Sequence, residues 1–338
     1  MRIGLVAPPW LPIPPLAYGG TEMVIDTLAR GFKEAGHEVL LAAASDSKCP
    51  VPLVPGTAAS DPDAVGTGHS ELYHVIRAYE GMNGVDLVHD HTLAGPLYRG
   101  RPSSLPALTT VHGALTAQLA GIYQAMARHV SIVAISYRQL AGTNLQAAAV
   151  IHHGIDTGAV PVGKGLGGYA CFLGRVSPDK GVAHAVTISR LAGIPLKIAA
   201  KMREPEELRY FHDVIEPMLG HNEEFLGEVG HGDKYRLLGD AMALLNPIQW
   251  PEPFGLVMIE ALASGTPVVA TRQGAAPEII EPGVTGYLAQ DDRELADLLP
   301  RAAALNRSVC RAAAENRFSA ERMTADHLKL YARMLAGP

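Results

Sequence analysis

The sequence predicts an α/β protein with two Rossmann-like domains, and three observations support this. Short apolar runs typical of buried parallel strands alternate with amphipathic helical segments. The alternation stops in a stretch rich in Gly, Pro and Val and then starts again. The length of 338 residues suits two domains. We therefore expect two open parallel sheets that bind ligands at the carboxyl ends of their strands, with the active site in the cleft between them.

The first domain is expected at residues 1–157. The apolar run at 3–7 predicts a buried strand, and Gly19-Gly20-Thr21-Glu22 opens a helical pattern with Thr21 as its predicted N-cap. Further strands are predicted at 37–43, 85–89, 107–111 and 131–135, and a further helix at 70–82.

A linker is expected at 158–168, and a second domain at 169–318. Its strands are predicted at 169–173, 196–200, 224–226, 243–246, 267–270 and 286–289, and its helices at 181–191, 205–219, 234–240 and 256–263. The tail at 319–338 contains an amphipathic helix, with Met323, His327, Leu330 and Met334 at helical spacing.

Composition excludes several classes of protein. A net charge of −6 argues against nucleic acid or an anionic membrane as the main partner. The three cysteines are scattered without a C-x-x-C pair, which is typical of reduced thiols in a cytoplasmic protein. Prolines interrupt the apolar N-terminus, and no run approaches the roughly 18 apolar residues of a membrane span. We expect a cytoplasmic protein.

Three motifs resemble known sites but have better structural interpretations. The glycines at 163–168 match G-x-G-x-x-G, but they precede a strand, whereas a dinucleotide site follows one. Asp61 and Asp63 could bind a metal-bound diphosphate, but they lie in a Pro/Gly-rich stretch that favours a solvated turn. The histidines at 89–91 and 152–153 suggest a metal site, but the first motif lacks the continuing Asp-His of a binuclear site, and no Glu-rich partner helix appears. We predict no metal ion.

Two carboxylates are the first candidate ligand-binding groups. Glu252 is expected in a loop and Glu260 inside a helix that begins near Gly255. A helix N-terminus presents free N–H groups to hydroxyl and phosphate oxygens, and carboxylates can bind the vicinal hydroxyls of a ribose or hexose. The alternative is that both glutamates are solvated surface residues.

Two cations complete the candidate site. Arg175 ends a predicted strand, and Lys180 lies where the next helix begins. A guanidinium, an ammonium and a helix N-terminus at the carboxyl end of a strand predict a diphosphate site. Unpaired surface cations are the alternative interpretation.

These segments resemble glycosyltransferase family 4, the retaining nucleotide-sugar transferases of the GT-B fold. The run EPFGLVMIEALASGTPVVA at 252–270 is similar to the family consensus, and LGRVSPDKG at 173–181 to its diphosphate-binding loop. Further matches lie at 19–22, 86–89 with His91, 110–113, 153–156 and 225–227. The order and spacing hold over nearly the whole chain.

The resemblance implies roles for the candidate residues. Arg175 and Lys180 would neutralise the departing nucleotide diphosphate, and Glu260 would bind the ribose hydroxyls. The donor sugar would be held by Glu252 and by the backbone N–H groups of Phe254, Gly255 and Leu256.

The first domain would contribute further groups. His112 would face the sugar, with a buried structural histidine as the alternative, and Gly19 and Gly20 would let the backbone approach the phosphate or the acceptor. The chain departs from the family pattern at 274–276, where Gly-Ala-Ala replaces a more usual double glycine. That change puts the donor contacts of this loop in doubt.

The resemblance therefore implies a retaining hexosyl- or pentosyltransferase that uses a nucleotide sugar, UDP-linked by family habit, and a small-molecule acceptor. It implies no cofactor and no metal, and a C-terminal helix that crosses back to the first domain. The composition also resembles a family-4 transferase of an antibiotic pathway. The alternatives are a sugar-nucleotide epimerase or phosphorylase on the same scaffold, or a non-catalytic nucleotide-sugar-binding protein.

Overall fold

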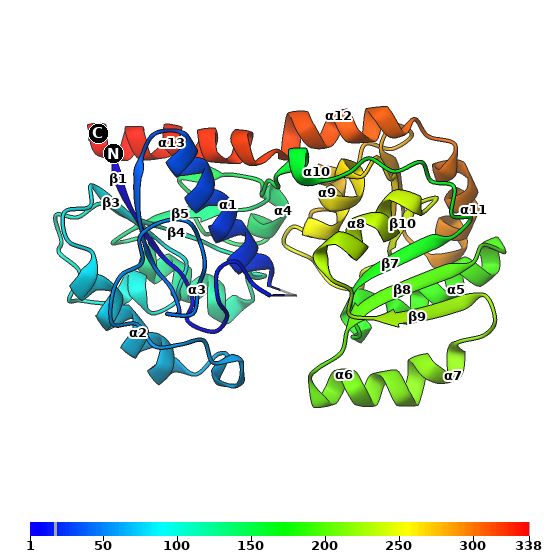
Figure 1. Ribbon diagram of the computed structural model, residues 1–338, viewed down its shortest axis with the longest axis horizontal. Coiled ribbons are helices and arrows are strands. Elements are labelled where there is room, and N and C mark those ends of the chain that lie inside the picture. The colour runs from blue at the N-terminus through cyan, green and yellow to red at the C-terminus, as the bar shows by residue number, and fades with distance from the viewer. Residues whose placement is uncertain (17–18, 338) are drawn as a thin grey trace. The chain divides into compact units, whose positions relative to one another are not determined.

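The computed structural model describes residues 1–16 and 19–337. Contacts divide the chain into two units: unit 1 is Met1–Gly154 with Ala320–Pro338, and unit 2 is Ile155–Ser319. Each unit contains one six-stranded sheet in which every pairing is parallel (Figure 1). The predicted α/β fold class with two parallel sheets is confirmed.

The sheet of unit 1 has the strand order β2-β1-β3-β4-β5-β6. Its strands are β1 (Arg2–Val6), β2 (Glu38–Ala42), β3 (Leu87–Asp90), β4 (Ala107–Thr110), β5 (Ser131–Ala134) and β6 (Ala149–Val150). The helices of this unit are α1 (Gly20–Glu34), α2 (Gly68–Gly81), α3 (Ala117–Met126), α4 (Tyr137–Leu140) and α13 (Ala320–Ala336).

The sheet of unit 2 has the strand order β12-β11-β10-β7-β8-β9. Its strands are β7 (Ala170–Arg175), β8 (Leu196–Lys201), β9 (Glu223–Gly227), β10 (Leu244–Asn246), β11 (Val268–Thr271) and β12 (Gly286–Ala289). Its helices are α5 (Val182–Ala192), α6 (Pro205–Tyr210), α7 (Glu216–Met218), α8 (His231–Asp240), α9 (Leu256–Ala263), α10 (Ala276–Ile279), α11 (Asp292–Ala303) and α12 (Arg307–Phe318).

Both sheets are buried on two faces, as continuous apolar strands require. All residues of β3, β4 and β11 are buried. In unit 2 the core forms where Phe172, Ile198 and Leu245 of neighbouring strands pack with apolar side chains of α5 and α11. Cys49, Cys171 and Cys310 are buried free thiols. Within the described part of the chain, no helix has both the length and the apolar character needed to cross a bilayer.

One helix prediction needs correction, and another gains detail. The structure places Gly19, not Thr21, at the N-cap of α1, where no side chain caps the helix. The carboxyl of Glu22 is buried in the first turn of α1, and burial raises its pKa. The helix predicted at 205–219 is observed as a continuous helical segment that consists of α6, a π-helical turn at Phe211–Ile215 and α7. Pro217 has no N–H for the regular hydrogen bond, and this disrupts the helix there.

The segment at 158–168 packs onto unit 2. The backbone N–H groups of Gly163, Gly165 and Gly167 donate to carbonyl oxygens of Ser264, Gly239 and Asp240 at 2.9–3.0 Å. The Arg307 guanidinium also donates to the Gly163 carbonyl at 3.0 Å. These glycines are therefore engaged with their own unit, and the segment does not open a helix as a dinucleotide motif would.

The C-terminal helix α13 belongs to unit 1 and packs against α1 (Figure 1). The hydroxyl of Tyr331 lies 2.7 Å from Nδ1 of His89 at the end of β3, and its ring lies 5.4 Å from the ring of Phe32. Where the two helices meet, α1 carries Gly31, and a Cβ atom there would lie 3.1 Å from Cβ of Thr324. The small residue permits this close approach.

We expect Gly31→Ala to lower the free energy of unfolding by about 1–3 kcal/mol, because an extra methyl overpacks the interface of α1 and α13. Gly121→Ala in α3 is the matched control, since a Cβ there meets no atom within 4 Å. The control should gain roughly 0.5–1 kcal/mol through helix propensity. Urea unfolding followed by circular dichroism measures both, and equal effects of the two substitutions would contradict the packing argument.

Candidate functional site

The loop after β7 carries both candidate cations. Strand β7 ends at Arg175, a 3₁₀ turn at Pro178–Lys180 follows, and α5 begins at Val182. Gly181 is the N-cap of α5 with φ 76°, and a Cβ there would collide with the carbonyl of Pro247. Only glycine suits this turn, which places Lys180 beside the N-terminus of α5.

Lys180 forms a compact cluster with Glu252 and Trp250, named here the Lys180 cluster. Its Nζ atom lies 2.6 Å from both carboxylate oxygens of Glu252, and each of the two side chains is 14% exposed. The indole N–H of Trp250 donates to Oε2 of Glu252 at 3.1 Å, and Lys180 Nζ lies 5.3 Å from the centre of the Trp250 ring. The structure therefore brings a predicted cation and a predicted carboxylate into direct contact.

Arg175 has other partners. Its guanidinium lies 3.5 Å from Oε1 of Glu207 and 3.6 Å from Oδ2 of Asp179. Glu207 is buried, whereas the Arg175 side chain is 33% exposed. The interpretation of Arg175 and Lys180 as unpaired surface cations is therefore wrong, because each contacts at least one carboxylate.

The loop that carries Glu252 is held by the loop at 274–276. Gly274 has φ 50°, and a Cβ there would collide with the backbone of Glu252. The N–H of Ala275 donates to the Glu252 carbonyl at 2.9 Å. The unusual Gly-Ala-Ala sequence thus keeps a glycine where the two loops leave no room for a Cβ atom.

Helix α9 starts directly after this loop. Gly255 is its N-cap and Leu256 its first residue, so the first N–H groups of the helix have no partner within it. The side chain of Phe254 is buried, with its ring 6.1 Å from that of Phe318. The predicted backbone donors at 254–256 therefore follow Glu252 directly in the sequence. In the structure they lie at the N-terminus of α9.

Glu260 lies inside α9 and is paired with Lys234 of α8. Lys234 Nζ is 2.6 Å from Oε1 of Glu260, and their side chains are 16% and 11% exposed. The interpretation of Glu252 and Glu260 as solvated surface residues is thus wrong as well. Sequence reasoning missed Lys234, because the pairing depends on how α8 packs against α9, and a separation of 26 positions gives no periodic signal.

Unit 1 carries a cluster of buried and half-buried histidines at the carboxyl edge of its sheet. This histidine cluster consists of His89, His91, His112, His153 and His327. Nδ1 of His91, after β3, lies 2.8 Å from Nε2 of His112, after β4, so one nitrogen donates to the other. The His112 ring also stacks on His153 at 5.5 Å.

Burial keeps these histidines neutral. It lowers the pKa of His112 to about 4, with a smaller contribution from His327. Burial likewise lowers the pKa of His89, His91 and His153 well below the usual value. A neutral His112 can exchange hydrogen bonds with a sugar hydroxyl, and its contacts with other rings also fit a structural role.

The remaining sequence candidates are placed as follows. Gly19 and Gly20 lie where α1 begins, on the chain leaving the carboxyl end of β1, and a Cβ on Gly19 would lie 2.7 Å from Cβ of Pro15. Asp61 and Asp63 are exposed, and Asp61 caps a short 3₁₀ turn by accepting from the Asp63 N–H at 3.1 Å. Across the described residues, no group of three or more His, Cys, Asp or Glu side chains is arranged to hold a metal ion.

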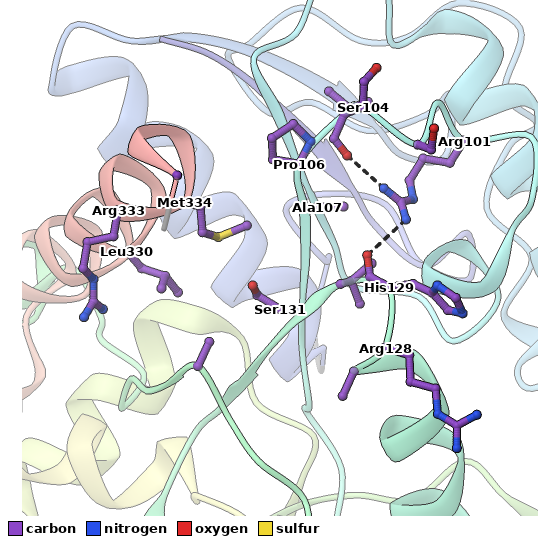
Figure 2. Close-up of a pocket in the computed structure, with 16 residues that line it drawn as sticks. Arg101, Ser104, Pro106, Ala107, Arg128, His129, Ser131, Leu330, Arg333 and Met334 are labelled. Atoms are coloured by element: carbon purple, nitrogen blue, oxygen red, sulfur yellow. Dashed lines mark hydrogen bonds between the residues drawn. The ribbon is translucent and has the colours of Figure 1, made fainter.

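A cavity of about 680 Å³ lies at the opposite edge of the unit 1 sheet (Figure 2). It is lined by Ala107 and Ser131, where β4 and β5 begin, and by Leu330 and Met334 of α13. The Arg101 guanidinium points to the carbonyls of Leu105 and His129, at 2.8 and 3.3 Å, so it holds these loops together. This cavity contains none of the predicted site residues.

The two parts of the chain match two known families. Residues 18–159 match "Glycosyltransferase Family 4", and residues 167–317 match "Glycosyl transferases group 1". A phosphatidyl-myo-inositol mannosyltransferase of Mycolicibacterium smegmatis is 28% identical over 86% of this chain and 81% of its own. A sucrose synthase of Acidithiobacillus caldus is 34% identical over 37% of this chain, and this match spans 16% of that enzyme.

Solved structures agree with these matches. AviGT4, a glycosyltransferase involved in avilamycin A biosynthesis, has a TM-score of 0.77 and 27% identity over 100% of this chain and 98% of its own. HepE of Anabaena, solved with UDP and glucose, shares the fold with a TM-score of 0.75 and 20% identity over 98% of this chain and 99% of its own. The predicted resemblance is confirmed, and the chain belongs to the glycosyltransferases of GT-B type, its first part to family 4 and its second to group 1.

Proposed function

We propose that the chain is a retaining glycosyltransferase that moves a sugar from a UDP-linked donor to a hydroxyl of a small-molecule acceptor, without a metal ion. The observation that carries this proposal is the Lys180 cluster, in which Lys180 Nζ lies 2.6 Å from both oxygens of Glu252. A buried ion pair adds little net stability compared with apolar residues of similar size. Its place at the carboxyl edge of a parallel sheet therefore favours a role in ligand binding.

Lys180 would stabilise the leaving diphosphate. Charge grows on the phosphate oxygen as the bond to the anomeric carbon breaks, and a fixed ammonium beside a helix N-terminus stabilises that charge. Arg175, with one third of its side chain exposed, would add a guanidinium to the same phosphates. Glu252, relieved of part of its contact with Lys180, would accept hydrogen bonds from hydroxyls of the donor sugar. The N–H groups at 254–256 would donate hydrogen bonds to oxygens of the same sugar.

Glu260 would hold the ribose of the donor. Its contact with Lys234 holds the carboxylate in place, and a carboxylate can accept hydrogen bonds from two vicinal hydroxyls. The choice of UDP is supported by HepE, which binds UDP and has the same fold. A role in antibiotic biosynthesis is supported by the likeness to AviGT4, which acts in such a pathway.

Retention would follow from attack on the face that the diphosphate leaves. The acceptor oxygen forms a bond to the anomeric carbon as the bond to the phosphate oxygen breaks, and the acceptor proton passes to the departing diphosphate. No side chain is assigned to a covalent intermediate. His112 would contribute as a neutral hydrogen-bonding group toward the sugar, consistent with its pKa of about 4.

The test combines binding with chemistry. Thermal unfolding with UDP, GDP, ADP and inorganic phosphate should show stabilisation by UDP of about 2.7 kcal/mol when the ligand is at a hundred times its Kd. The slow hydrolysis of UDP-glucose and other UDP-sugars should then proceed equally well with and without EDTA. NMR of the first sugar product formed should show the α-anomer from an α-linked donor.

Each outcome addresses a separate part of the proposal. Stabilisation by no nucleoside diphosphate would refute the donor class. Loss of turnover in EDTA would refute metal independence, and a β-anomer as the first product would refute retention.

A further inference from the structure

Trp250 is the one member of the Lys180 cluster that has no role in the proposed reaction so far. It lies in the loop between β10 and α9, two residues before Glu252, and its side chain is half-buried. The indole has a single N–H and no acceptor, and this N–H donates to Oε2 of Glu252 at 3.1 Å. The hydrogen-bonding capacity of Trp250 is therefore used on one carboxylate oxygen.

The direction of the Glu252 carboxylate depends on two side chains. Its hydrogen-bond partners among the described residues are Lys180 and Trp250. The backbone of Glu252 is fixed separately, because its N–H donates to the Trp250 carbonyl at 2.8 Å and its carbonyl accepts from the Ala275 N–H at 2.9 Å. These backbone bonds hold the loop, but they leave the side-chain torsions of Glu252 free to change.

The two partners differ in what they can do when a ligand binds. The Lys180 ammonium lies 2.6 Å from both carboxylate oxygens, but it has three N–H groups on a flexible four-carbon stem and can turn to a phosphate oxygen. The Trp250 indole is rigid, and its N–H points to Oε2 of Glu252. A diphosphate that attracts Lys180 therefore removes one partner of Glu252 and leaves the other.

We propose that Trp250 is a positioning residue of the donor site, which keeps Glu252 directed at the donor sugar while Lys180 turns to the diphosphate. The bond from Trp250 occupies Oε2 and leaves Oε1, which Lys180 contacts, to accept from a sugar hydroxyl. A carboxylate that is already oriented loses less freedom when the sugar binds. This role rests on the proposed function, since it requires a donor with both a diphosphate and a sugar.

Trp250→Phe tests the bond, because phenylalanine keeps an aromatic ring and removes the N–H. Calorimetry gives the Kd of UDP, UDP-glucose, UDP-galactose and UDP-N-acetylglucosamine for the wild type and the variant. For the UDP-sugar that binds the wild type most tightly, we expect the Kd to rise about tenfold or more, the effect of losing one hydrogen bond to a charged group. The Kd of UDP should change by less than about threefold, because water hydrates Glu252 where no sugar covers it.

Tyr169→Phe is the matched control. It also deletes one hydrogen bond of an aromatic side chain in unit 2, from the Tyr169 hydroxyl to the Leu237 carbonyl at 3.0 Å. Tyr169 lies directly before β7, whereas Lys180 follows the carboxyl end of that strand. The Kd values of UDP and of the UDP-sugar should therefore both stay at their wild-type level in this variant.

A double-mutant cycle shows whether Trp250 acts through Glu252. In a Glu252→Ala protein the indole has no carboxylate to orient. Adding Trp250→Phe to this protein should change the Kd of the UDP-sugar by less than about threefold, because the two substitutions remove the same interaction.

The indole N–H also gives a direct signal. NMR spectra of protein with isotopically labelled tryptophan contain two indole signals, from Trp10 and Trp250, and the Trp250→Phe variant identifies the second. We expect the Trp250 indole proton to exchange slowly with water both without ligand and with saturating UDP-sugar. The same proton should exchange faster in the Glu252→Ala protein.

The outcomes separate this role from the proposed function. Equal losses of UDP and UDP-sugar affinity in Trp250→Phe, or no loss of either, overturn the role of Trp250 and leave the proposed function standing. A sugar-specific loss that persists in the Glu252→Ala protein has the same meaning, as does fast exchange of the indole proton in the UDP-sugar complex. A wild-type protein that binds neither UDP nor any of the three UDP-sugars refutes the proposed donor, and with it the role of Trp250.

Discussion

Replacing Lys180 by alanine should lower kcat by roughly a hundredfold or more. The substitution removes the ammonium that we assign to the leaving diphosphate, and the loss of one preorganised donor of this kind costs about 2.7–4 kcal/mol in the transition state. It also leaves Glu252 without the cation that lies 2.6 Å from both of its oxygens. Steady-state kinetics with a UDP-sugar at saturating concentration measures the effect.

Lys197→Ala provides a matched control for this experiment. Lys197 also combines an ion pair with an aromatic contact, at 3.2 Å from Glu224 and 4.8 Å from the Tyr169 ring. It lies near the amino end of β8, however, at the opposite edge of the sheet. We expect the control to keep its kcat within about twofold. A Lys180→Ala enzyme that turns over as fast as the control would rule out the assigned role.

Lowering the pH should destabilise unit 1 more than the protonation of exposed histidines would. The pKa values of His112 and His327 are lowered to about 4, whereas an unfolded histidine has a pKa near 6.5. Between those values the unfolded chain binds protons that the native state does not, so stability falls as the pH falls. At pH 5 each of these two histidines should contribute about 2 kcal/mol of destabilisation relative to pH 7.5.

Three carboxyls of unit 1, Glu22, Glu71 and Asp90, act in the opposite direction because burial raises their pKa values. Burial raises the pKa of Asp90 to about 6, so the native state takes up that proton first and gains about 1.4 kcal/mol at pH 5. His89, His91 and His153, whose pKa values are lowered further, add to the destabilisation. The net expectation is a loss of several kcal/mol between pH 7.5 and pH 5, a large share of the stability of an ordinary protein.

Urea unfolding at pH 7.5, 6 and 5 measures this loss. His327→Leu should reduce the slope of stability against pH by up to about 1.4 kcal/mol per unit, because one buried titration is removed. His129→Gln is the control, since His129 is exposed at the surface. Unchanged stability over this range, or the same slope in both variants, would show that the histidine cluster does not resist protonation.

The sequence by itself determined the fold class and the family. Strands can be predicted because they depend on local apolar runs. The family motifs at 173–181 and 252–270 place cations, carboxylates and helix starts within a few residues of each other. The enzyme class, glycosyltransferase, is confirmed by the family matches. The roles assigned to Arg175, Lys180, Glu252, Glu260 and His112 remain predictions.

Only the tertiary structure decided which of these side chains touch. Lys180 and Glu252 are 72 residues apart, and Lys234 and Glu260 are 26 apart, so their contacts follow from how loops and helices pack. The histidine cluster likewise joins β3, β4 and α13, from opposite ends of the chain. Local pattern specifies strands and helices because it acts over a few residues, whereas side-chain pairing across the sheet edge depends on packing that no local pattern encodes.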